Sequence, residues 1–576
     1  MPELAVLYDP DAGNWLRFAN PLEVLSAHSR DQVLPTLEYI ERRVEEDGLY
    51  AAGLVSYEAA SAFDEALQTS APGDFPLLHF GLFAAAERIK LPLPASEADL
   101  PHWQAQESAA DFAAKVDLIR NAIAHGETYQ VNLTFPLHSD FSQDSWPFFL
   151  QLAYGQRAGG AGYLRTSRWD ICSVSPELFF TRDGAQLCMR PMKGTAPRGL
   201  TLAEDRRQAQ SLLQSAKNRA ENIMILDMVR NDLGKLAPPG GVSTAAICAL
   251  EKYPTIWQLT STAVAQSEAS LAEIFQALFP CASITGAPKA KTMQIIATTE
   301  TGPRQLYTGT FGWLAPGRRA RFNVAIRTVL IDKQFKCARY DVGAGITWDS
   351  ESNAEYRECL DKAAVLTRHP GDFALIESLR WTPAKGYFIM PEHLARLQAS
   401  AEYFDFPCGV DLVDEYLQSL AGNFPDTPQR VRLLLHENGA LDGTFAPLLP
   451  NQRSPLRIRF AAHPIEVEDV RLYHKTTQRQ FYETCKNEAA DVDEVVLWNQ
   501  RNEVTECCTA NLVIEKDGRL VTPPLTSGLL PGTYRNFLLR RGVLAEQVIS
   551  MDDLRASPRI FLINAVRKWR RAELCL

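Results

Sequence analysis

Long hydrophobic runs are missing from this sequence. Hydrophobic residues make up 46% of the 576 positions, but no uninterrupted apolar stretch approaches the ~18–20 residues that a membrane helix needs. The first residues, Met-Pro-Glu-Leu-Ala, also lack the basic stretch and the apolar stretch of a secretory signal. We therefore expect a cytoplasmic protein that does not enter a membrane.

An excess of positive charge is missing as well. The chain has 59 Lys and Arg residues against 69 Asp and Glu residues, which gives a net charge of −10. This balance argues against a nucleic-acid-binding surface. An anionic small molecule would have to be bound by arginine and lysine side chains that gather locally.

Paired cysteine motifs are the third absence. Eleven cysteines are scattered along the chain, and none forms a Cys-x-x-Cys pair. Without a secretory signal, this pattern is typical of reduced thiols in the cytosol. Low-complexity tracts are missing too, so we expect an ordinary folded protein.

The length predicts more than one domain, because single cores stop growing near about 250–300 residues. The predicted boundary is Thr367-Arg-His-Pro-Gly-Asp372, where Pro370 and Gly371 would end a preceding helix. From residue 126 to about 365, strands and helices alternate without a strict βαβ rhythm, which favours an α+β fold. We expect one domain at 1–368 and a second at 373–576.

Three carboxylates are predicted to lie on helices. Glu355, Glu358 and Lys362 are spaced three and four residues apart, which places them on one helical face. Glu221 precedes the apolar run 223–226 on another predicted helix. A solvated Glu–Lys pair is the ordinary interpretation of such a trio. If the two helices met, a hard cation such as Mg²⁺ would relieve the repulsion between the carboxylates.

Lys193 is the most informative single residue. It lies between an apolar strand and a Gly-Thr turn, in Met189-Arg-Pro-Met-Lys-Gly-Thr-Ala-Pro-Arg198. Burial lowers the pKa of a lysine and frees its lone pair for nucleophilic attack. A solvated turn is the ordinary alternative for a lysine in such a run.

Six ordered motifs around Lys193 resemble those of the chorismate-utilising enzymes, a family that includes anthranilate, isochorismate, salicylate and aminodeoxychorismate synthases. The motifs are Gly126-Glu-Thr-Tyr-Gln-Val-Asn132, Ser175-Pro-Glu-Leu-Phe179, Arg190-Pro-Met-Lys-Gly-Thr195, Lys217 to Asp232, Thr285-Gly-Ala-Pro-Lys289, and Gly343-Ala-Gly345 continuing through Glu355 to Lys362. The resemblance covers about residues 1–368. It implies the α/β sandwich of that family, with chorismate as substrate.

The resemblance implies a magnesium site and an anion-binding site. Glu221 and Glu358 would ligate Mg²⁺ directly, and Glu355 would act through a water molecule. Many relatives carry a second acid where this chain has Asn218. The residues implied in substrate binding are Tyr307, Arg327, Gly343, Gly345, Lys362 and Thr285. The guanidinium of Arg327 would hold one substrate carboxylate with Tyr307, and Lys362 would pair with the ring carboxylate.

The resemblance also implies the first reaction. Glu177 would protonate the departing ring hydroxyl. Gln130 occupies the position at which water-using members carry a lysine, so an amination is implied. Lysine before the Gly-Thr resembles the aminodeoxychorismate synthase component I branch, since anthranilate synthases carry alanine there. Lys193 would attack ring C2, and ammonia would then add at C4.

The ammonia has to come from another protein. No cysteine has the Gly-x-Cys-x-Gly context of a glutaminase nucleophile, so a separate glutamine amidotransferase subunit is expected.

The second part resembles the fold-type IV pyridoxal-phosphate enzymes. The matching motifs are His393-Leu-Ala-Arg-Leu397, His474-Lys-Thr476, Val504-Thr-Glu-Cys-Cys-Thr-Ala-Asn511, Thr522-Pro-Pro-Leu525 and Gly528-Leu-Leu-Pro-Gly-Thr533. The resemblance implies that Lys475 binds pyridoxal 5′-phosphate covalently and acts as acid and base. Glu506 would face the pyridine nitrogen. Arg396 and the backbone at Gly532 and Thr533 would hold the phosphate.

Together the two resemblances imply a bifunctional enzyme of 4-aminobenzoate synthesis for folate. The first part would aminate chorismate at C4, and the second would eliminate pyruvate as a lyase. One alternative is an anthranilate synthase fused to a branched-chain or D-amino-acid aminotransferase. A second is a chorismate-binding regulatory protein without activity, against which the intact set of predicted catalytic residues argues. Ser378 aligns loosely with a hydroxyl residue of the lyases, and a homodimer through the second part stays open.

Overall fold

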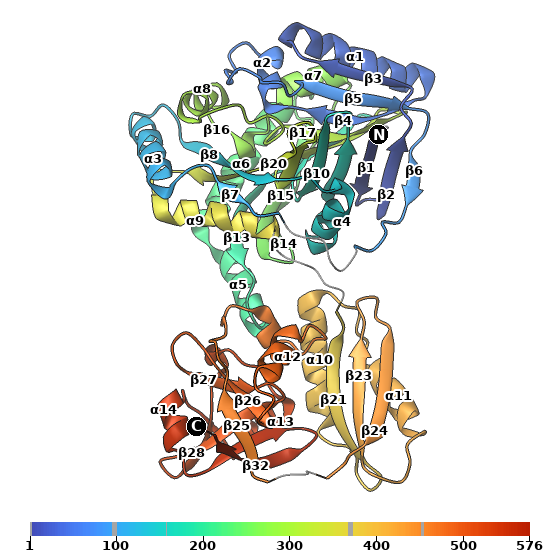
Figure 1. Ribbon diagram of the computed structural model, residues 1–576. Coiled ribbons are helices and arrows are strands. Elements are labelled where there is room, and N and C mark those ends of the chain that lie inside the picture. The colour runs from blue at the N-terminus through green and yellow to red at the C-terminus, as the bar shows by residue number, and fades with distance from the viewer. Residues whose placement is uncertain (1–2, 95–100, 157, 367–372, 451–453, 576) are drawn as a thin grey trace. The chain divides into compact units, whose positions relative to one another are not determined.

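The computed structural model describes residues 3–94, 101–156, 158–366, 373–450 and 454–575 (Figure 1). The chain divides into two compact units. Unit 1 comprises residues 1–197 and 209–370, and unit 2 comprises residues 198–208 and 371–576. The predicted boundary segment 367–372 lies outside the described residues. The expectation of a second domain at 373–576 did not include residues 198–208, which group with unit 2.

Unit 1 contains two antiparallel sheets of ten strands each. In spatial order the first consists of β16 (Gly286–Ala287), β8 (Gln130–Asp140), β20 (Cys337–Ile346), β19 (Thr328–Asp332), β10 (Trp169–Ser175), β9 (Gly160–Arg165), β1 (Leu4–Asp9), β2 (Asn14–Ala19) and β6 (Glu87–Ile89), with β7 (Gln104–Ala105) beside β8. The second consists of β13 (Met192–Pro197), β15 (Ile256–Gln266), β12 (Gln186–Arg190), β11 (Leu178–Asp183), β18 (Arg319–Val324), β17 (Thr310–Ala315), β4 (Tyr50–Val55), β5 (Leu78–Phe83) and β3 (Glu23–Ala27), with β14 (Val242–Lys252) beside β15.

The two sheets pack face to face, and helices cover their outer faces. Leu7 and Phe18 of the first sheet share a buried cluster with Leu54 and Phe311 of the second. The outer face of the first sheet packs against α3 (Ala109–Ala124), α4 (Ser145–Gln156), α8 (Lys289–Thr299) and α9 (Ser352–Ala363). The outer face of the second packs against α1 (Arg30–Asp47), α2 (Ala60–Phe63), α6 (Ala216–Gly234) and α7 (Leu271–Leu278). The predicted α+β sandwich is confirmed.

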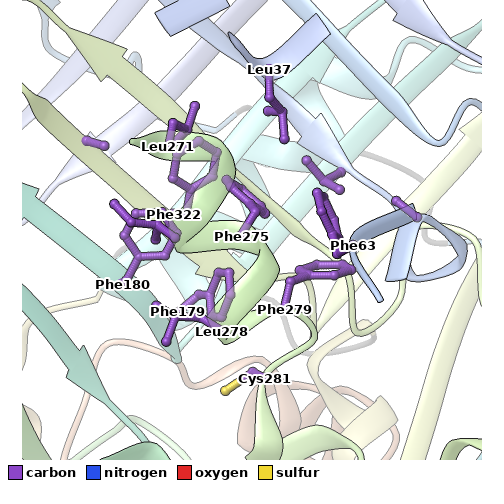
Figure 2. Packing of buried hydrophobic residues seen from close by; sticks show 14 of the residues in the cluster. Leu37, Phe63, Phe179, Phe180, Leu271, Phe275, Leu278, Phe279, Cys281 and Phe322 are labelled. Atoms are coloured by element: carbon purple, nitrogen blue, oxygen red, sulfur yellow. The ribbon is translucent and has the colours of Figure 1, made fainter. Parts of the chain in front are cut away.

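Helix α7 shows how local sequence builds the outer layer. The Ser270 hydroxyl accepts from the backbone N–H of Glu273, and the Glu273 carboxylate accepts from the backbone N–H of Ser270. These two bonds form a capping box. Leu271, Ile274, Phe275 and Leu278 follow at helical spacing, and all four are buried. Figure 2 shows the Phe275 ring among aromatic neighbours, with ring centroids 5.3 Å from Phe322, 5.6 Å from Phe63 and 5.7 Å from Phe180.

Unit 2 contains two further sheets. The four-stranded sheet runs β22 (Gly386–Tyr387), β21 (Leu375–Thr382), β23 (Gln429–Leu435), β24 (Leu441–Pro447), and it packs against α10 (Met390–Phe404) and α11 (Val410–Ala421). The eight-stranded sheet runs β27 (Val504–Cys507), β26 (Glu494–Trp498), β25 (Leu456–Phe460), β32 (Lys568–Leu574), β31 (Ile560–Asn564), β28 (Ala510–Lys516), β29 (Arg519–Thr522), β30 (Ala545–Glu546). Since β27 also pairs with β28, six of these strands close into a ring.

Four shorter or connecting helices complete the fold. They are α5 (Leu202–Gln214), α12 (Gln480–Asn487), α13 (Thr533–Arg540) and α14 (Met551–Ala556). Within the described ranges, no helix combines the length and the apolarity that crossing a bilayer requires.

Candidate active sites

Lys193 lies on an irregular part of strand β13. The register of β13 against β15 shifts between Met192 and Thr195, so the lysine leaves the regular ladder. Burial lowers the pKa of Lys193, while the nearby carboxylates of Glu221 and Glu358 oppose that shift. A lysine with a lowered pKa retains more of the free amine, which is the nucleophilic form.

Asn222 fixes the backbone at Lys193. Its side-chain amide donates to the carbonyl of Lys193 (2.9 Å) and to the carbonyl of Leu259 (3.1 Å). Its oxygen accepts from the Ser261 hydroxyl at 2.5 Å. Because Asn222 directly follows Glu221 on α6, one buried amide ties the lysine strand to the helix that carries a predicted magnesium ligand.

Gln130 and Lys193 face the same space over Gly345. A Cβ placed on Gly345 would lie 2.5 Å from Gln130 Nε2 and 2.6 Å from Lys193 Nζ. Only glycine leaves this space open. Gln130 is buried, and no donor in the described part of the chain reaches its Oε1. An unpaired buried acceptor beside the lysine amine suits a ligand with N–H bonds, such as ammonia.

Glu177 is held as a weak acid between β10 and β11. Its side chain is buried, and burial raises its pKa to about 7. The Ser283 hydroxyl donates to Oε1 at 2.5 Å, and this bond and Lys193 partly oppose the rise. A carboxyl group with a pKa near neutrality can hold and release a proton, as the predicted general acid requires.

The predicted anion-binding residues show an unpaired cationic group. Burial lowers the pKa of Arg327, and among the described residues its Nη1 has no hydrogen-bond acceptor. A buried guanidinium nitrogen without a partner fits a substrate carboxylate. A Cβ on Gly343 would lie 3.1 Å from the Tyr307 hydroxyl, so Gly343 keeps the space beside Tyr307 open. Arg327 itself has a positive φ of 48°, a conformation that favours glycine.

The predicted magnesium ligands lie on α6 and α9. The Glu221, Glu355 and Glu358 carboxylates all raise the pKa of Lys193, against the effect of burial. Lys362 Nζ pairs with Glu358 at 2.8 Å and donates to the Gly343 carbonyl at 2.9 Å. Oxygen donors of this kind suit Mg²⁺. In the parts of the chain that the structure describes, the donors do not form a ready three-ligand cluster.

Thr285 is fully buried, and its hydroxyl donates to the Cys281 carbonyl at 3.1 Å. The Asn132 N–H donates to the Thr285 carbonyl at 2.9 Å, which joins this loop to β8. Thr285 therefore connects structural elements through its own backbone and hydroxyl. Its predicted contact with substrate stays a prediction.

In unit 2, Lys475 is a buried amine among charged groups. Burial lowers its pKa to about 8, and Arg396 and Arg479 act in the same direction. Glu377 and Glu506 oppose that shift. A lysine poised near neutrality can both attack a carbonyl and move protons, as the predicted role of Lys475 requires.

Glu506 is a buried carboxylate that forms no ion pair within the described ranges, although Lys475 and Arg479 act on its pKa. It accepts from the Tyr482 hydroxyl (3.1 Å) and from the Asn511 amide (3.3 Å). Burial raises its pKa to about 7. A protonated ring nitrogen would supply the missing positive charge, which fits the predicted contact with the pyridine of pyridoxal phosphate.

Arg396 is oriented by Glu377, a residue that the sequence analysis did not single out. Arg396 donates to both carboxylate oxygens of Glu377, at 2.9 Å and 2.7 Å, and His393 pairs with the same carboxylate at 2.5 Å. Despite its burial, the pKa of Glu377 falls to about 2, because Arg396 and His393 favour its charged form. Nε and Nη2 of Arg396 therefore bind a protein carboxylate, and Nη1 donates to the Pro531 carbonyl at 3.4 Å.

Gly532 and Thr533 begin helix α13. Gly532 is the residue before the helix, and a Cβ there would lie 1.8 Å from Asn511 Oδ1. Only glycine permits this approach, which brings α13 against the strand that follows Glu506. With Lys475, Arg396 and Glu506, the donor set fits pyridoxal phosphate in charge and chemistry.

The structure adds Ser283, Asn222, Glu377 and Tyr482 to the predicted site residues. Asn222 lies within the Lys217 to Asp232 motif, but the motif does not predict its hydrogen bond to the Lys193 carbonyl. Glu377 and Ser283 are single polar residues beside apolar ones, and nothing in the local pattern distinguishes them from ordinary polar residues. Their partners lie 16 and 106 residues away, respectively.

A cavity of about 760 Å³ in unit 1 lies apart from these residues. Its lining includes His102, His138, Arg168 and Arg339 but none of the predicted site residues. Arg168 pairs with Asp332, and Arg339 pairs with Asp341. Both arginines of the lining are therefore already paired with carboxylates.

Comparisons with known proteins define the class. Residues 3–368 match the chorismate binding enzyme family, and residues 374–575 match amino-transferase class IV. The chain belongs to the chorismate binding enzymes and carries a class IV aminotransferase domain after that part. The resemblance predicted from the motifs is confirmed. Membership implies Mg²⁺ for the first family and pyridoxal phosphate for the second.

Individual relatives cover part of the chain. Aminodeoxychorismate synthase component 1 of Escherichia coli (strain K12) is 38% identical over 263 residues, which is 45% of this chain and 57% of that protein. Anthranilate synthase component 1 3 of Haloarcula marismortui is 36% identical over 278 residues, 48% of this chain and 54% of that protein. The matched regions thus span little more than half the length of these curated relatives.

A solved structure supports the fold of the first part. Anthranilate synthase component I from Streptococcus pneumoniae TIGR4 superposes with a TM-score of 0.54 at 20% identity, covering 64% of this chain and 92% of that chain. At this identity the likeness concerns the fold alone.

Proposed function

We propose that the chain converts chorismate to 4-aminobenzoate in two reactions. Unit 1 aminates chorismate at C4 to give 4-amino-4-deoxychorismate, and unit 2 eliminates pyruvate from that product. The observation that carries the proposal is that Lys193 Nζ and Gln130 Nε2 both lie next to the position that a Cβ on Gly345 would take, while Lys193 acts on the raised pKa of Glu177. A nucleophile, an ammonia-binding amide and an acid are the three groups that the amination needs.

The first reaction follows from these residues. The Lys193 amine adds to ring C2 while Glu177 protonates the C4 hydroxyl, which leaves as water. Ammonia, held by the Gln130 oxygen, adds at C4, and the bond between Lys193 and C2 breaks to return the amine. Arg327 and Lys362 orient the substrate carboxylates throughout. Glu221 and Glu358 would hold Mg²⁺, which supplies positive charge at a substrate carboxylate.

The second reaction uses the polar groups of unit 2. Pyridoxal phosphate, when bound, supplies an electron sink. Lys475 holds and moves the proton that the departing pyruvate needs, and its pKa of about 8 suits both directions of transfer. Glu506 orients the ring, and Arg396 with the backbone at Gly532 and Thr533 positions the phosphate. Fusion to the aminating unit favours a lyase, because unit 1 produces the lyase substrate.

The anthranilate synthase alternative keeps one observation in its favour, since such enzymes are among the relatives. In that reaction ammonia adds at C2, the carbon that Lys193 would occupy. A lysine amine in that space therefore favours attack at C4. An aminotransferase reaction in unit 2 is the corresponding alternative for the second half.

Ammonia would come from a separate glutamine amidotransferase. None of the eleven cysteines stands in the Gly-x-Cys-x-Gly context of a glutaminase nucleophile. We expect the purified chain to use ammonium salts directly and to use glutamine only when a glutaminase is added. Glutamine-dependent turnover by the chain alone would contradict this part of the proposal.

Product analysis tests the proposed function. The chain would be incubated with chorismate, ammonium, Mg²⁺ and pyridoxal phosphate, and the products would be separated by chromatography. The proposal predicts equal amounts of 4-aminobenzoate and pyruvate. With pyridoxal phosphate removed, 4-amino-4-deoxychorismate should accumulate instead. Anthranilate as the main product would overturn the proposal.

A further inference from the structure

A segment that precedes helix α6 in the sequence forms part of unit 2. Residues 198–208 follow the Lys193 strand directly, yet they group with residues 371–576. The Arg198 guanidinium lies over the Tyr403 ring at 4.5 Å and donates to the Tyr403 carbonyl at 3.0 Å. Leu200 packs against a buried cluster that includes Tyr473 and Cys508.

The segment is tightly closed around Asp205. Arg198 donates to both carboxylate oxygens of this buried aspartate, at 2.6 Å and 2.9 Å. The backbone N–H of Gly199 donates to the same carboxylate at 3.0 Å. A Cβ on Gly199 would lie 2.1 Å from the Asp205 nitrogen, so any side chain there would force the loop apart.

The closed segment presents the Leu200 carbonyl to His474. The distance from His474 Nε2 to this oxygen is 3.2 Å. Burial lowers the pKa of His474 to about 4, so its ring is neutral at physiological pH and carries one N–H. Because a carbonyl only accepts, the proton must lie on Nε2. Nδ1 then accepts from the Ser400 hydroxyl at 2.9 Å, and a single tautomer satisfies both partners.

His474 directly precedes Lys475. Its ring also lies against Tyr403, with centroids 4.4 Å apart, and against Phe404 at 4.9 Å. The Lys475 carbonyl accepts from the Ile376 N–H at 2.8 Å. The backbone at Lys475 is therefore fixed by its hydrogen bond to β21, and the residue before it is fixed by the contacts of the His474 ring.

We propose that Arg198 to Asp205 is a positioning element of the pyridoxal-phosphate site. The Leu200 carbonyl holds His474 in one tautomer and orientation, and His474 in turn sets the position of Lys475. The inference rests on the proposed cofactor site of unit 2, but it does not depend on whether that site acts as a lyase or as an aminotransferase. Residues 373–576 then lack one part of their own site.

The test uses the full chain loaded with pyridoxal phosphate. Gly199→Ala and Asp205→Asn open the segment, and His474→Phe removes both ring hydrogen bonds. Arg206→Ala is the matched control, because Arg206 lies on the same segment and its guanidinium pairs with Glu402 at an exposed position. Two properties are measured: the pH midpoint of the bound cofactor's absorbance change, and the dissociation constant of the cofactor after dilution. Thermal unfolding verifies that each variant is folded.

Loss of one buried hydrogen bond corresponds to about a fivefold change in an equilibrium constant. We expect Gly199→Ala, Asp205→Asn and His474→Phe to weaken cofactor retention by about that factor, and to shift the absorbance midpoint by about half a pH unit. Arg206→Ala should match the parent. Gly199→Ala should add nothing to His474→Phe in the double variant, because both act through the same ring. If Gly199→Ala does not fold, Asp205→Asn decides alone.

Two results would overturn the inference and are distinguishable. Variants that keep the parent's midpoint and retention would overturn the positioning role and leave the proposed function intact. A parent chain that takes up no pyridoxal phosphate would overturn the proposed function of unit 2, and the inference with it.

Discussion

At the scale of single residues, the environment of each titratable group sets its role. Burial shifts the pKa values of four groups toward neutral pH: Glu177, Lys193, Lys475 and Glu506. The pKa of Glu377 is lowered instead, because two cations oppose the effect of burial. In the proposed function, the groups that exchange protons are those whose charge has no full compensation, whereas the charge of Glu377, which binds Arg396, is compensated by two cations.

Glu177 gives a prediction about pH. It must be protonated to act as an acid, so the amination rate should fall as pH rises through about 7, the raised pKa of this carboxyl group. Ser283 donates to the carboxylate and lowers that pKa. Ser283→Ala should therefore move the falling limb to higher pH. Glu177→Gln should lose about 10²- to 10⁴-fold in amination rate.

Initial rates of 4-amino-4-deoxychorismate formation across pH measure both effects. Lyase activity on supplied 4-amino-4-deoxychorismate serves as the control, since Glu177 and Ser283 lie in unit 1. If the pH at which the amination rate falls is unchanged in Ser283→Ala, a group other than Glu177 causes that fall.

Gly345 gives a second residue prediction. Gly345→Ala would place a methyl group within 2.6 Å of both Lys193 Nζ and Gln130 Nε2, so one of them must move. We expect at least about a tenfold loss of amination, equivalent to about 1.4 kcal/mol in the barrier. Gly317→Ala is a control with open space at the Cβ position, although its positive φ costs some stability. Full amination activity in Gly345→Ala would remove the argument for a shared space.

At the scale of elements, helices α6 and α9 carry the predicted metal ligands of unit 1. α6 begins where the Ser215 hydroxyl accepts from the Asn218 N–H, and it then presents Glu221 and Asn222. α9 presents Glu355, Glu358 and Lys362 at the predicted spacing. The chemistry of unit 1 depends on how these two helices meet β13 and β20.

Helix α7 allows a stability prediction. Phe275 is fully buried among Phe63, Phe180 and Phe322. Phe275→Ala should destabilise unit 1 by about 3–5 kcal/mol, the usual cost of such a cavity. Phe335→Ala is the matched control, because that side chain is 65% exposed. Denaturant unfolding followed by intrinsic fluorescence measures both, and equal stability of the two variants would contradict the core described here.

The helices that carry the predicted metal ligands could be predicted from the sequence. The helical placement of Glu221 and the shared face of Glu355 and Lys362 follow from periodicity, because helical spacing is local. The bond from Asn222 to Lys193 joins residues 29 positions apart. The pairing of Ser283 with Glu177 spans 106 positions. Local patterns do not encode such distances, so these contacts required the structure.

At the scale of the whole molecule, the proposed function assigns two reactions to one chain, with a lysine at the centre of each. The two lysines belong to different units. The sequence predicted two domains, but it did not predict that residues 198–208 join unit 2. That segment lacks a distinctive motif, and only its contacts assign it.

The magnesium ligands give a prediction that separates the units. Glu221→Gln and Glu358→Gln should each abolish amination, because each removes an oxygen donor and a negative charge from the proposed metal site. Cofactor binding and lyase activity in unit 2 should be unaffected. The two rates are measured separately, with chorismate and with supplied 4-amino-4-deoxychorismate. Loss of both activities in one variant would indicate misfolding, and retention of amination would contradict the ligand assignment.

The most direct test of the central claim compares the two lysines. Lys193→Ala and Lys475→Ala would each be given chorismate, ammonium, Mg²⁺ and pyridoxal phosphate, and the products would be quantified. The account predicts that Lys475→Ala stops at 4-amino-4-deoxychorismate and that Lys193→Ala makes almost none, yet still converts supplied 4-amino-4-deoxychorismate to 4-aminobenzoate and pyruvate. Borohydride reduction of the unmutated chain should fix the cofactor to Lys475. Cofactor trapped on Lys193, or anthranilate as the main product of the unmutated chain, would contradict the account.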